Sequence, residues 1–267
     1  MPFDLGHFSL GDMLRCGLGV RRVARDAPTM ESAARAISRY LYDECIDPHT
    51  GERSCALVRC YKTQSYSTLD PSLQAFARRQ LGGEPPSSDM RCLTLLATVG
   101  DDPRWNSRAD SRGHRAIPLP SVELVAKAPM IAQLIRDFGL DIADVIRPVP
   151  DVTGDPAGKT YNVFHVEEAS GSPHIPAQDE FVRPYGLRSV VGFGGVLATG
   201  DLFAIILFSR TPIPPSSAER FRAIALDVSV LFHLREQRVF DAPPPRLDLE
   251  GPGGGSFTDP GVRPPPP

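Results

Sequence analysis

The chain has 267 residues, a formal net charge of −3, and is 41% hydrophobic and 23% charged. This composition is ordinary for a globular protein with one large or two small domains, and the absence of net basicity gives no indication of a nucleic-acid surface. The sequence has no apolar run of about 18 residues and no secretory signal at its N-terminus, so we expect a cytoplasmic protein that neither crosses nor binds a membrane.

Helical and strand-like patterns alternate along the first hundred residues. Gly17 and Gly19 weaken the first helix, whereas the nearly continuous apolar run MRCLTLLATV predicts a central, well-covered strand. The expected elements are helices over residues 8–26 and 29–42, a turn over 47–51, a strand over 54–63, a short helix from Asp70-Pro71, a loop over 82–89 and a strand over 90–99.

The middle of the chain is less regular. Residues 100–120 form a long polar segment with no clear period. A helix is expected from Ser121, with a kink or a break at Pro129 because proline cannot donate to the helix ladder, and Gly139 is a natural stop. A Pro/Gly loop over 147–158, a strand over 159–166 and a loop over 167–180 should follow.

The stretch 181–232 carries the strongest local pattern. Two β-rich apolar runs flank a Thr199-Gly200-Asp201 turn, which predicts a hairpin. After it, Ser216 and Glu219 have the spacing of a capping box at the start of a helix. Apolar residues then recur at helical spacing, namely Phe221, Ile224, Ala225, Val228, Leu231 and Phe232.

The last 27 residues contain nine Pro and five Gly. Such a segment cannot bury enough surface to offset its ordering entropy, so we expect a disordered tail over 241–267. A polyproline II ligand at Pro243–Pro245 or Pro264–Pro267 is the alternative. The expected organisation is an N-terminal helical extension over 1–28, a domain over 29–240 and this tail.

Five cysteines occur without any CxxC pair. We expect free, mostly buried thiols in a reducing cytoplasm rather than a disulfide framework, and no metal site, because zinc or iron–sulfur ligands would need closer pairs. The cysteines are Cys16, Cys45, Cys55, Cys60 and Cys92.

Several motifs in the second half resemble those of GAF domains. Phe181-Val182 with Tyr185-Gly186 resembles the approach to the fifth strand of that family, and Arg188-Ser189-Val190-Val191 resembles the entry into it. Residues 200–208 resemble the last strand, although Ala204 stands where many members have Gly. The resemblance implies an α+β fold with a GAF-like central antiparallel sheet flanked by helices, including helices near both ends.

A broader resemblance extends to GAF-like segments of bacterial signalling proteins, which often lie upstream of histidine kinase modules. It includes WNSRADSRGH, AIPLPS, APMIAQLI and KTYNVFHVEEASGSPHIPAQDEFVRPYGLRSVVGFGG. The chain has no His-box helix and no ATP-binding glycine motif. The resemblance therefore implies a sensor that acts through a partner, and it names no ligand or cofactor.

Segment 101–116 contains the only Trp of the chain, Trp105, together with Arg108 and His114. Long ordered loops are usually functional, so this segment could be a lid over a pocket. The alternative is a surface loop held in place by one buried Trp.

The predicted strand over 159–166 places Tyr161 and His165 on one face. If that face is turned inward, both would line the cavity in which GAF ligands bind, and His165 could ligate haem iron or bind a nucleotide. A structural His bonded to a backbone carbonyl is the more frequent alternative.

Further candidates flank the next strand. Arg188 could hold a carboxylate or phosphate, or it could pair with a nearby acidic residue, and Tyr185 lies beside it. The GFGG sequence around Phe193 is not a dinucleotide loop, because a strand continues on both sides of it. Its alternate glycines favour a bulge or the close approach of a ligand.

Three functions remain open. The first is a non-enzymatic GAF-like sensor that binds a small ligand, dimerises through its terminal helices and regulates a partner such as a histidine kinase. The second is a ligand-free dimeric adaptor, which would have a filled core. The third is an enzyme with an unrecognised site, although no GxSxG, HExxH, P-loop or kinase signature occurs.

Overall fold

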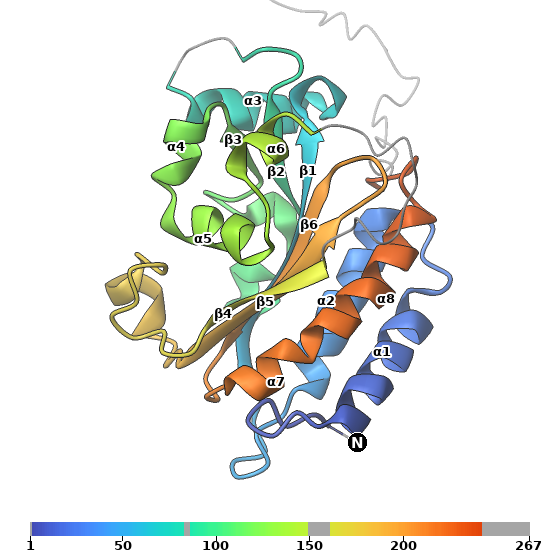
Figure 1. The fold of residues 1–267 in the computed structure, drawn as a ribbon, viewed down its shortest axis with the longest axis vertical. Coiled ribbons are helices and arrows are strands. Elements are labelled where there is room, and N and C mark those ends of the chain that lie inside the picture. Colours follow the sequence, from blue (N-terminus) through green and yellow to red (C-terminus); the bar gives the residue numbers. More distant parts are fainter. Residues whose placement is uncertain (1, 83–85, 149–160, 242–267) are drawn as a thin grey trace, which may run out of the picture.

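The computed structural model describes residues 2–82, 86–148 and 161–241 (Figure 1). Most of the predicted loop over 147–158 and nearly all of the predicted tail over 241–267 lie outside the described residues. Among the helices of these three ranges, none is both long and apolar enough to cross a membrane.

A six-stranded sheet forms the centre of the molecule, and every pair of neighbouring strands is antiparallel. The strand order is β3-β2-β1-β6-β5-β4, so the first and last strands of the chain pair at the centre. The strands are β1 (Cys55–Ser65), β2 (Arg91–Gly100), β3 (Ala116–Leu119), β4 (Tyr161–Val166), β5 (Ser189–Val196) and β6 (Leu202–Ser209).

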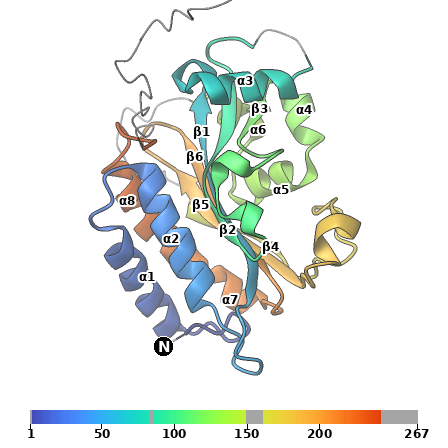
Figure 2. The same cartoon turned by 180° about the vertical axis from the view of Figure 1, so that it is seen from behind.

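Helices cover both faces of this sheet (Figures 1 and 2). One face carries α1 (Leu10–Ala24), α2 (Met30–Glu44) and α8 (Phe221–His233), with α7 (Pro215–Glu219) leading into α8. The other face carries α4 (Val122–Ala126), α5 (Pro129–Asp137) and α6 (Ile142–Ile146), and α3 (Pro71–Gln80) covers one end. The expected α+β fold with a central antiparallel sheet is confirmed.

The sheet separates two hydrophobic cores. Along β1, Val58 and Cys60 point into the core beneath α1, α2 and α8, whereas Leu57 and Tyr61 point into the core beneath α5. Both faces of the central strands are therefore covered, and the residues of β1 and β2 are buried almost throughout.

The glycines of α1 permit close helix packing. The helix runs through Gly17 and Gly19, where a Cβ would collide with Asp227 of α8 and with Tyr40 of α2, respectively. Phe3, from the segment before α1, is buried in the same core. The N-terminal residues are thus packed against the rest of the fold.

Two local predictions are wrong. The segment over 100–120, which shows no period, contains strand β3 beside β2. The predicted capping box at Ser216 is absent, because α7 begins at Pro215 after Pro214 and ends before α8, without a side-chain cap. Ser217 instead accepts a hydrogen bond from the backbone N–H of Phe8, at 3.1 Å.

The predicted hairpin turn is confirmed, with Gly200 at a φ of 80°. Asp201, directly after it, pairs with both Lys62 and Arg91, and all three side chains are largely buried. The five cysteines are all free and buried, as expected.

Candidate functional site

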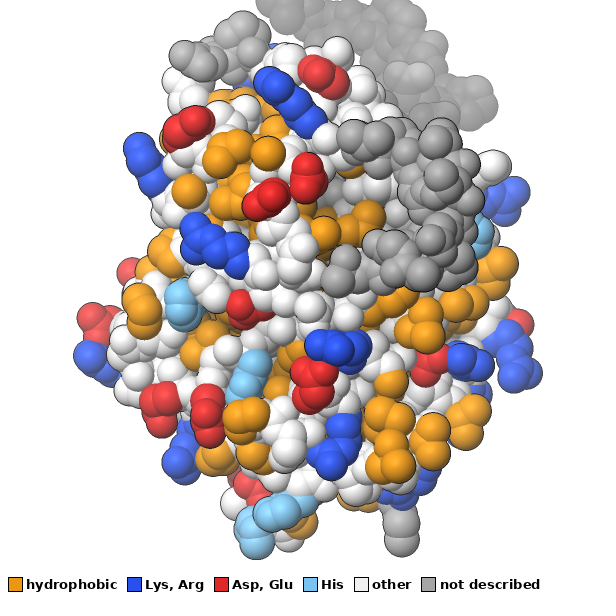
Figure 3. All heavy atoms as spheres, in the orientation of Figure 1, with side chains coloured by type: hydrophobic (Ala, Val, Ile, Leu, Met, Phe, Trp, Pro, Cys, Tyr) orange, Lys and Arg blue, Asp and Glu red, His pale blue; other side chains and the backbone are white. Residues whose placement is uncertain are grey.

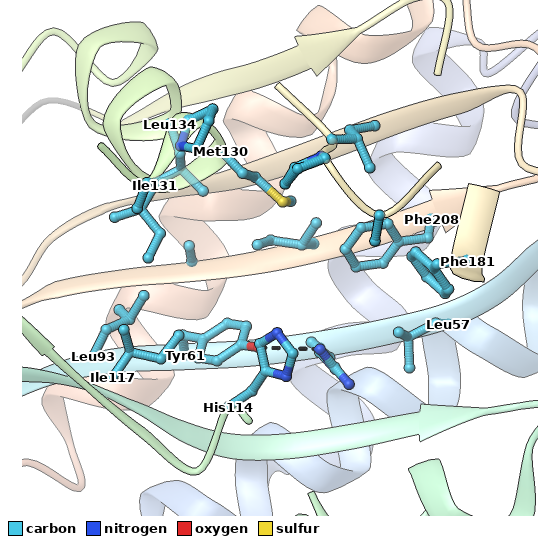
Figure 4. A pocket seen from close by; sticks show the side chains of 18 of the residues that line it. Leu57, Tyr61, Leu93, His114, Ile117, Met130, Ile131, Leu134, Phe181 and Phe208 are labelled. Atoms are coloured by element: carbon cyan, nitrogen blue, oxygen red, sulfur yellow. Dashed lines mark hydrogen bonds between the residues drawn. The ribbon is translucent and has the colours of Figure 1, made fainter. Parts of the chain in front are cut away.

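The core beneath α5 contains a cavity of about 470 Å³ between that helix and the sheet (Figure 4). A volume of this size is typical of sites for small organic ligands. Most of its lining is apolar. The strands contribute Leu57, Leu93, Ile117, Leu119, Leu202, Ala204, Ile206 and Phe208, and α5 contributes Pro129, Met130, Ile131, Leu134 and Ile135.

Small residues of β5 allow α5 to lie close to the sheet. A Cβ on Gly194 would lie 2.9 Å from the ring of Phe138, and one on Gly192 would lie 3.2 Å from the ring of Phe164. At Gly194 the nearest atom to such a Cβ would be the backbone carbonyl oxygen of Phe203 on the neighbouring strand β6. The close approach expected at these glycines is therefore made by backbone and aromatic side chains of the protein itself.

An aromatic cluster closes one end of the cavity. The ring of Trp105 lies 4.5 Å from that of Tyr185 and 5.5 Å from that of Phe181, which in turn lies 5.1 Å from Phe208. Trp105, Phe181 and Phe208 line the cavity. Phe181 belongs to a single π-helical turn, Gln178–Val182. The predicted loop over 167–180 also supplies part of the wall, through Ile175, Pro176, Ala177 and Glu180.

The segment that carries Trp105 is held by hydrogen bonds. Asn106 Nδ2 donates to the carbonyl of Gly100 at 2.9 Å, and the N–H of Gly100 donates to Asn106 Oδ1 at 3.3 Å. Gly100 also leaves room for the indole, since a Cβ there would lie 2.7 Å from it. Trp105 is half-buried and lines the cavity. A role of this segment as a lid stays a prediction.

The cavity has a small polar group on the side of β1. Arg59 and Tyr61 alternate with helix-side residues along this strand, and Arg59 Nη1 lies 3.5 Å from the hydroxyl of Tyr61. His114, from the segment between β2 and β3, completes the group beside Tyr61 (Figure 4). Among the described residues, these three side chains offer a ligand polar contacts on the β1 side of the cavity.

The pKa values of Tyr61 and His114 determine the protonation states of this polar group. Burial raises the pKa of Tyr61, while the positive charge of Arg59 opposes the rise, so the phenol keeps its proton. His114 has an exposed side at the cavity mouth, yet enclosure by the walls and the charge of Arg59 lower its pKa. The imidazole is therefore neutral at pH 7.

Two of the eight residues predicted from the sequence, Trp105 and His114, line this cavity. Tyr185 lies immediately behind it, against Trp105, with its hydroxyl 3.4 Å from Asp102 Oδ2. Ligand binding by these residues stays a prediction.

Tyr161, His165 and Phe193 lie on the opposite face of the sheet. The condition for Tyr161 and His165 to line the cavity is not met, because β4 turns Phe164 toward the cavity side and the alternate residues toward α8. His165 Nε2 donates to the carbonyl of Ile213 at 2.8 Å, which is the structural role given above as the alternative. Tyr161 accepts a hydrogen bond from Ser229, and Phe193 is fully buried.

The two predicted arginines also lie outside the cavity. Arg108 forms a bidentate pair with Glu31 of α2, at 2.7 and 3.3 Å, and its guanidinium lies 4.6 Å from the ring centre of Phe240. The side chain of Arg188 is exposed at the surface. Arg108 therefore ties its segment to α2 and the C-terminal part of the described chain.

Sequence reasoning missed Arg59 and Tyr61. A signal was present, because a single Arg within the apolar strand sequence SCALVRCYKT is unusual for a buried strand. Within residues 2–82, 86–148 and 161–241, no three His, Cys, Asp or Glu side chains lie close enough together to hold a metal ion.

No family model matches the chain, and no curated protein matches it. Solved structures do. One is the free methionine-R-sulfoxide reductase of Neisseria meningitidis in complex with its substrate, at 11% identity and a TM-score of 0.44 over 85% of this chain and 92% of that one. Another is the GAF domain of an Acinetobacter phosphoenolpyruvate-protein phosphotransferase, at 11% identity and a TM-score of 0.41 over 84% and 95%.

A third is the phycoerythrobilin-bound GAF domain of a cyanobacterial phytochrome, at 11% identity and a TM-score of 0.40 over 84% of this chain and 96% of that one. At these identities and TM-scores, the matches say nothing about the ligand, the chemistry or the partner of this chain.

Proposed function

We propose that this protein is a cytoplasmic bacterial sensor that binds a small, mainly apolar molecule in the cavity beneath α5. Binding would regulate a signalling partner such as a histidine kinase. The observation that carries the proposal is the cavity itself, about 470 Å³ in volume, with an apolar lining and one small polar group. A ligand-free adaptor would instead be expected to fill this space with side chains.

The test is native mass spectrometry of freshly purified protein, together with calorimetric titration with 1-octanol as an apolar probe. Ala204 is a buried cavity-lining residue of β6, so Ala204→Leu would fill part of the space while leaving an apolar interior. We expect a bound small molecule or measurable octanol binding in the wild type, and loss of both in the variant. A clean apo mass and no octanol binding in the folded wild type would overturn the proposal.

Dimerisation through the terminal helices is the second part of the proposal. Hydrophobic side chains gather on the surface over α1 and α8 (Figure 3). They form two rows, each with a spacing of four residues, and are between 49% and 73% exposed. The rows are Leu10, Leu14 and Leu18 on α1, and Leu226, Val230 and Leu234 on α8.

A second copy of this chain fits such a surface. The two rows lie on helices that pack against each other, α1 and α8, and rows of residues four apart are the ridges that interdigitate when helices pack. Because both helices present the same kind of row, the surface is self-complementary, as a twofold dimer interface requires. Exposed apolar patches of this kind mark interaction sites.

Light scattering of the wild type and of Leu14→Glu/Val230→Glu tests the dimer. We expect a dimeric wild type and a monomeric double variant. Leu124→Glu is the matched control, because Leu124 is 53% exposed on α4, away from this surface, and it should leave the dimer intact. A wild type that stays monomeric at the highest soluble concentration would refute this part of the proposal.

A further inference from the structure

Arg59 is placed unusually for a cationic side chain. It projects from the central strand β1 into a cavity with apolar walls, and its Nε is buried without a hydrogen-bond partner. In the described part of the chain, no carboxylate lies within ion-pair distance of it. Burying a charge in apolar surroundings is costly unless the charge is paired.

The neighbours of Arg59 do not neutralise it. Tyr61 is a protonated phenol and His114 a neutral imidazole, so both offer hydrogen bonds but no negative charge. Glu180 is the one carboxylate that lines the described cavity, and it is exposed at the rim. The interior therefore carries one positive charge beside two neutral polar groups.

We infer that the cavity binds an organic acid, with a single carboxylate on Arg59 and an apolar body against α5. A carboxylate accepts two hydrogen bonds from a guanidinium in the favourable forked geometry, and Tyr61 and His114 lie where they can donate to it as well. A doubly charged phosphate fits less well, because only one cation faces the interior. This inference rests on the proposed sensor function and names the ligand class.

The cavity walls away from the polar group determine which apolar groups the ligand can carry. Met130, Ile131 and Leu134 lie across the cavity from the polar group, while Phe181 and Phe208 line the other end of the cavity (Figure 4). An aliphatic or aromatic body directed toward these residues would be buried away from water, while the carboxylate remains in contact with Arg59 of β1. Apolar burial supplies the affinity, and Arg59 selects the acid over its neutral analogues.

Calorimetric titration with octanoate and 1-octanol tests the inference on the full chain, because the two probes share a chain length and differ in the head group. We expect the wild type to bind octanoate about tenfold to a hundredfold more tightly than octanol, the range for a hydrogen bond to a charged group. In Arg59→Met this preference should vanish while octanol binding persists, which also shows that the variant is folded. In Tyr61→Phe the preference should fall about two- to tenfold.

Arg188→Met is the matched control, since it removes an exposed arginine outside the cavity and should keep the full preference. Equal octanoate and octanol binding in the wild type and in Arg59→Met would overturn the acid assignment and leave the sensor proposal standing. Tighter binding of octyl phosphate than of octanoate would overturn the assignment of a carboxylate head group and favour a phosphate instead. Failure of the wild type to bind any of the three probes would count against the sensor function itself.

Discussion

Asp201 shows how much can depend on one residue in this fold. It follows the β5–β6 turn and pairs with Lys62 of β1 and Arg91 of β2, all three side chains being largely buried. Its hydroxyl neighbour Thr199 donates a further hydrogen bond to it, at 2.9 Å. The carboxylate thus joins the hairpin to two other strands through two largely buried basic side chains.

Replacing Asp201 by Ala should therefore remove the acidic partner of two largely buried basic side chains. We expect the free energy of unfolding, measured by urea denaturation, to fall by about 3–5 kcal/mol, as for other broken buried ion pairs. Asp179→Ala is the control, because Asp179 pairs with Arg183 at the surface and should cost less than about 1 kcal/mol. Similar losses in the two variants would show that Asp201 contributes no more than a surface pair.

Single residues were also where the candidate site was hardest to predict. The strand SCALVRCYKT is apolar on both faces, because helices cover both sides of β1, so alternation alone cannot tell which residues face a cavity. Trp105 and His114 could be singled out because they stand in a polar segment. Arg59 is one of several polar residues of β1, and only the packed fold shows that its side chain faces the cavity.

Among the elements, those with a long, strong period were predicted well and short ones were not. Helices α1, α2 and α5 present apolar residues at helical spacing, and their positions agree with the sequence to within a few residues. Strand β3 has only four residues and contains Pro118, so it carries too little pattern to be recognised. The break between α7 and α8 was missed because Ser216 and Glu219 have the spacing of a capping box directly before an apolar stripe that begins at Phe221.

Helix α1 contains a pair of glycines with opposite expected behaviour. At Gly19 a Cβ would collide with the ring of Tyr40 on α2, whereas at Gly11 the nearest heavy atom is Ser9 Oγ at 3.7 Å. Gly19→Ala should thus lower the free energy of unfolding by about 1–3 kcal/mol through overpacking. Gly11→Ala should raise it by about 0.4–1 kcal/mol, because the alanine restricts the unfolded chain.

Chemical denaturation of both variants checks this pair. Stabilisation by Gly19→Ala would contradict the close packing of α1 on α2, since the general gain in helix propensity would then exceed the cost of the collision.

At the scale of the whole molecule, the single sheet should make the two cores unfold together. Trp105, the only Trp, reports on the cavity side, and Cys16 and Cys45 report on the helix side. Burial raises the pKa of Cys16 to about 12, so this thiol stays protonated and slow to react while the fold is intact.

We therefore expect urea transitions followed by Trp105 fluorescence and by thiol labelling to have the same midpoint, as in a two-state process. A fluorescence transition at lower urea than the labelling transition would show that the cavity side opens by itself.

The central position of β1 and β6 also determines when the protein can fold during its synthesis on the ribosome. Val58 pairs with Leu207, and α1 rests on α8, so the innermost contacts join segments that leave the ribosome far apart in time. Until α8 is synthesised, the nascent chain holds α1 and α2 without the surfaces that they cover in the finished fold. Such long-range closure slows folding and leaves apolar helix faces open to aggregation in the meantime, so the growing chain should depend on chaperones most strongly just before its last helix emerges.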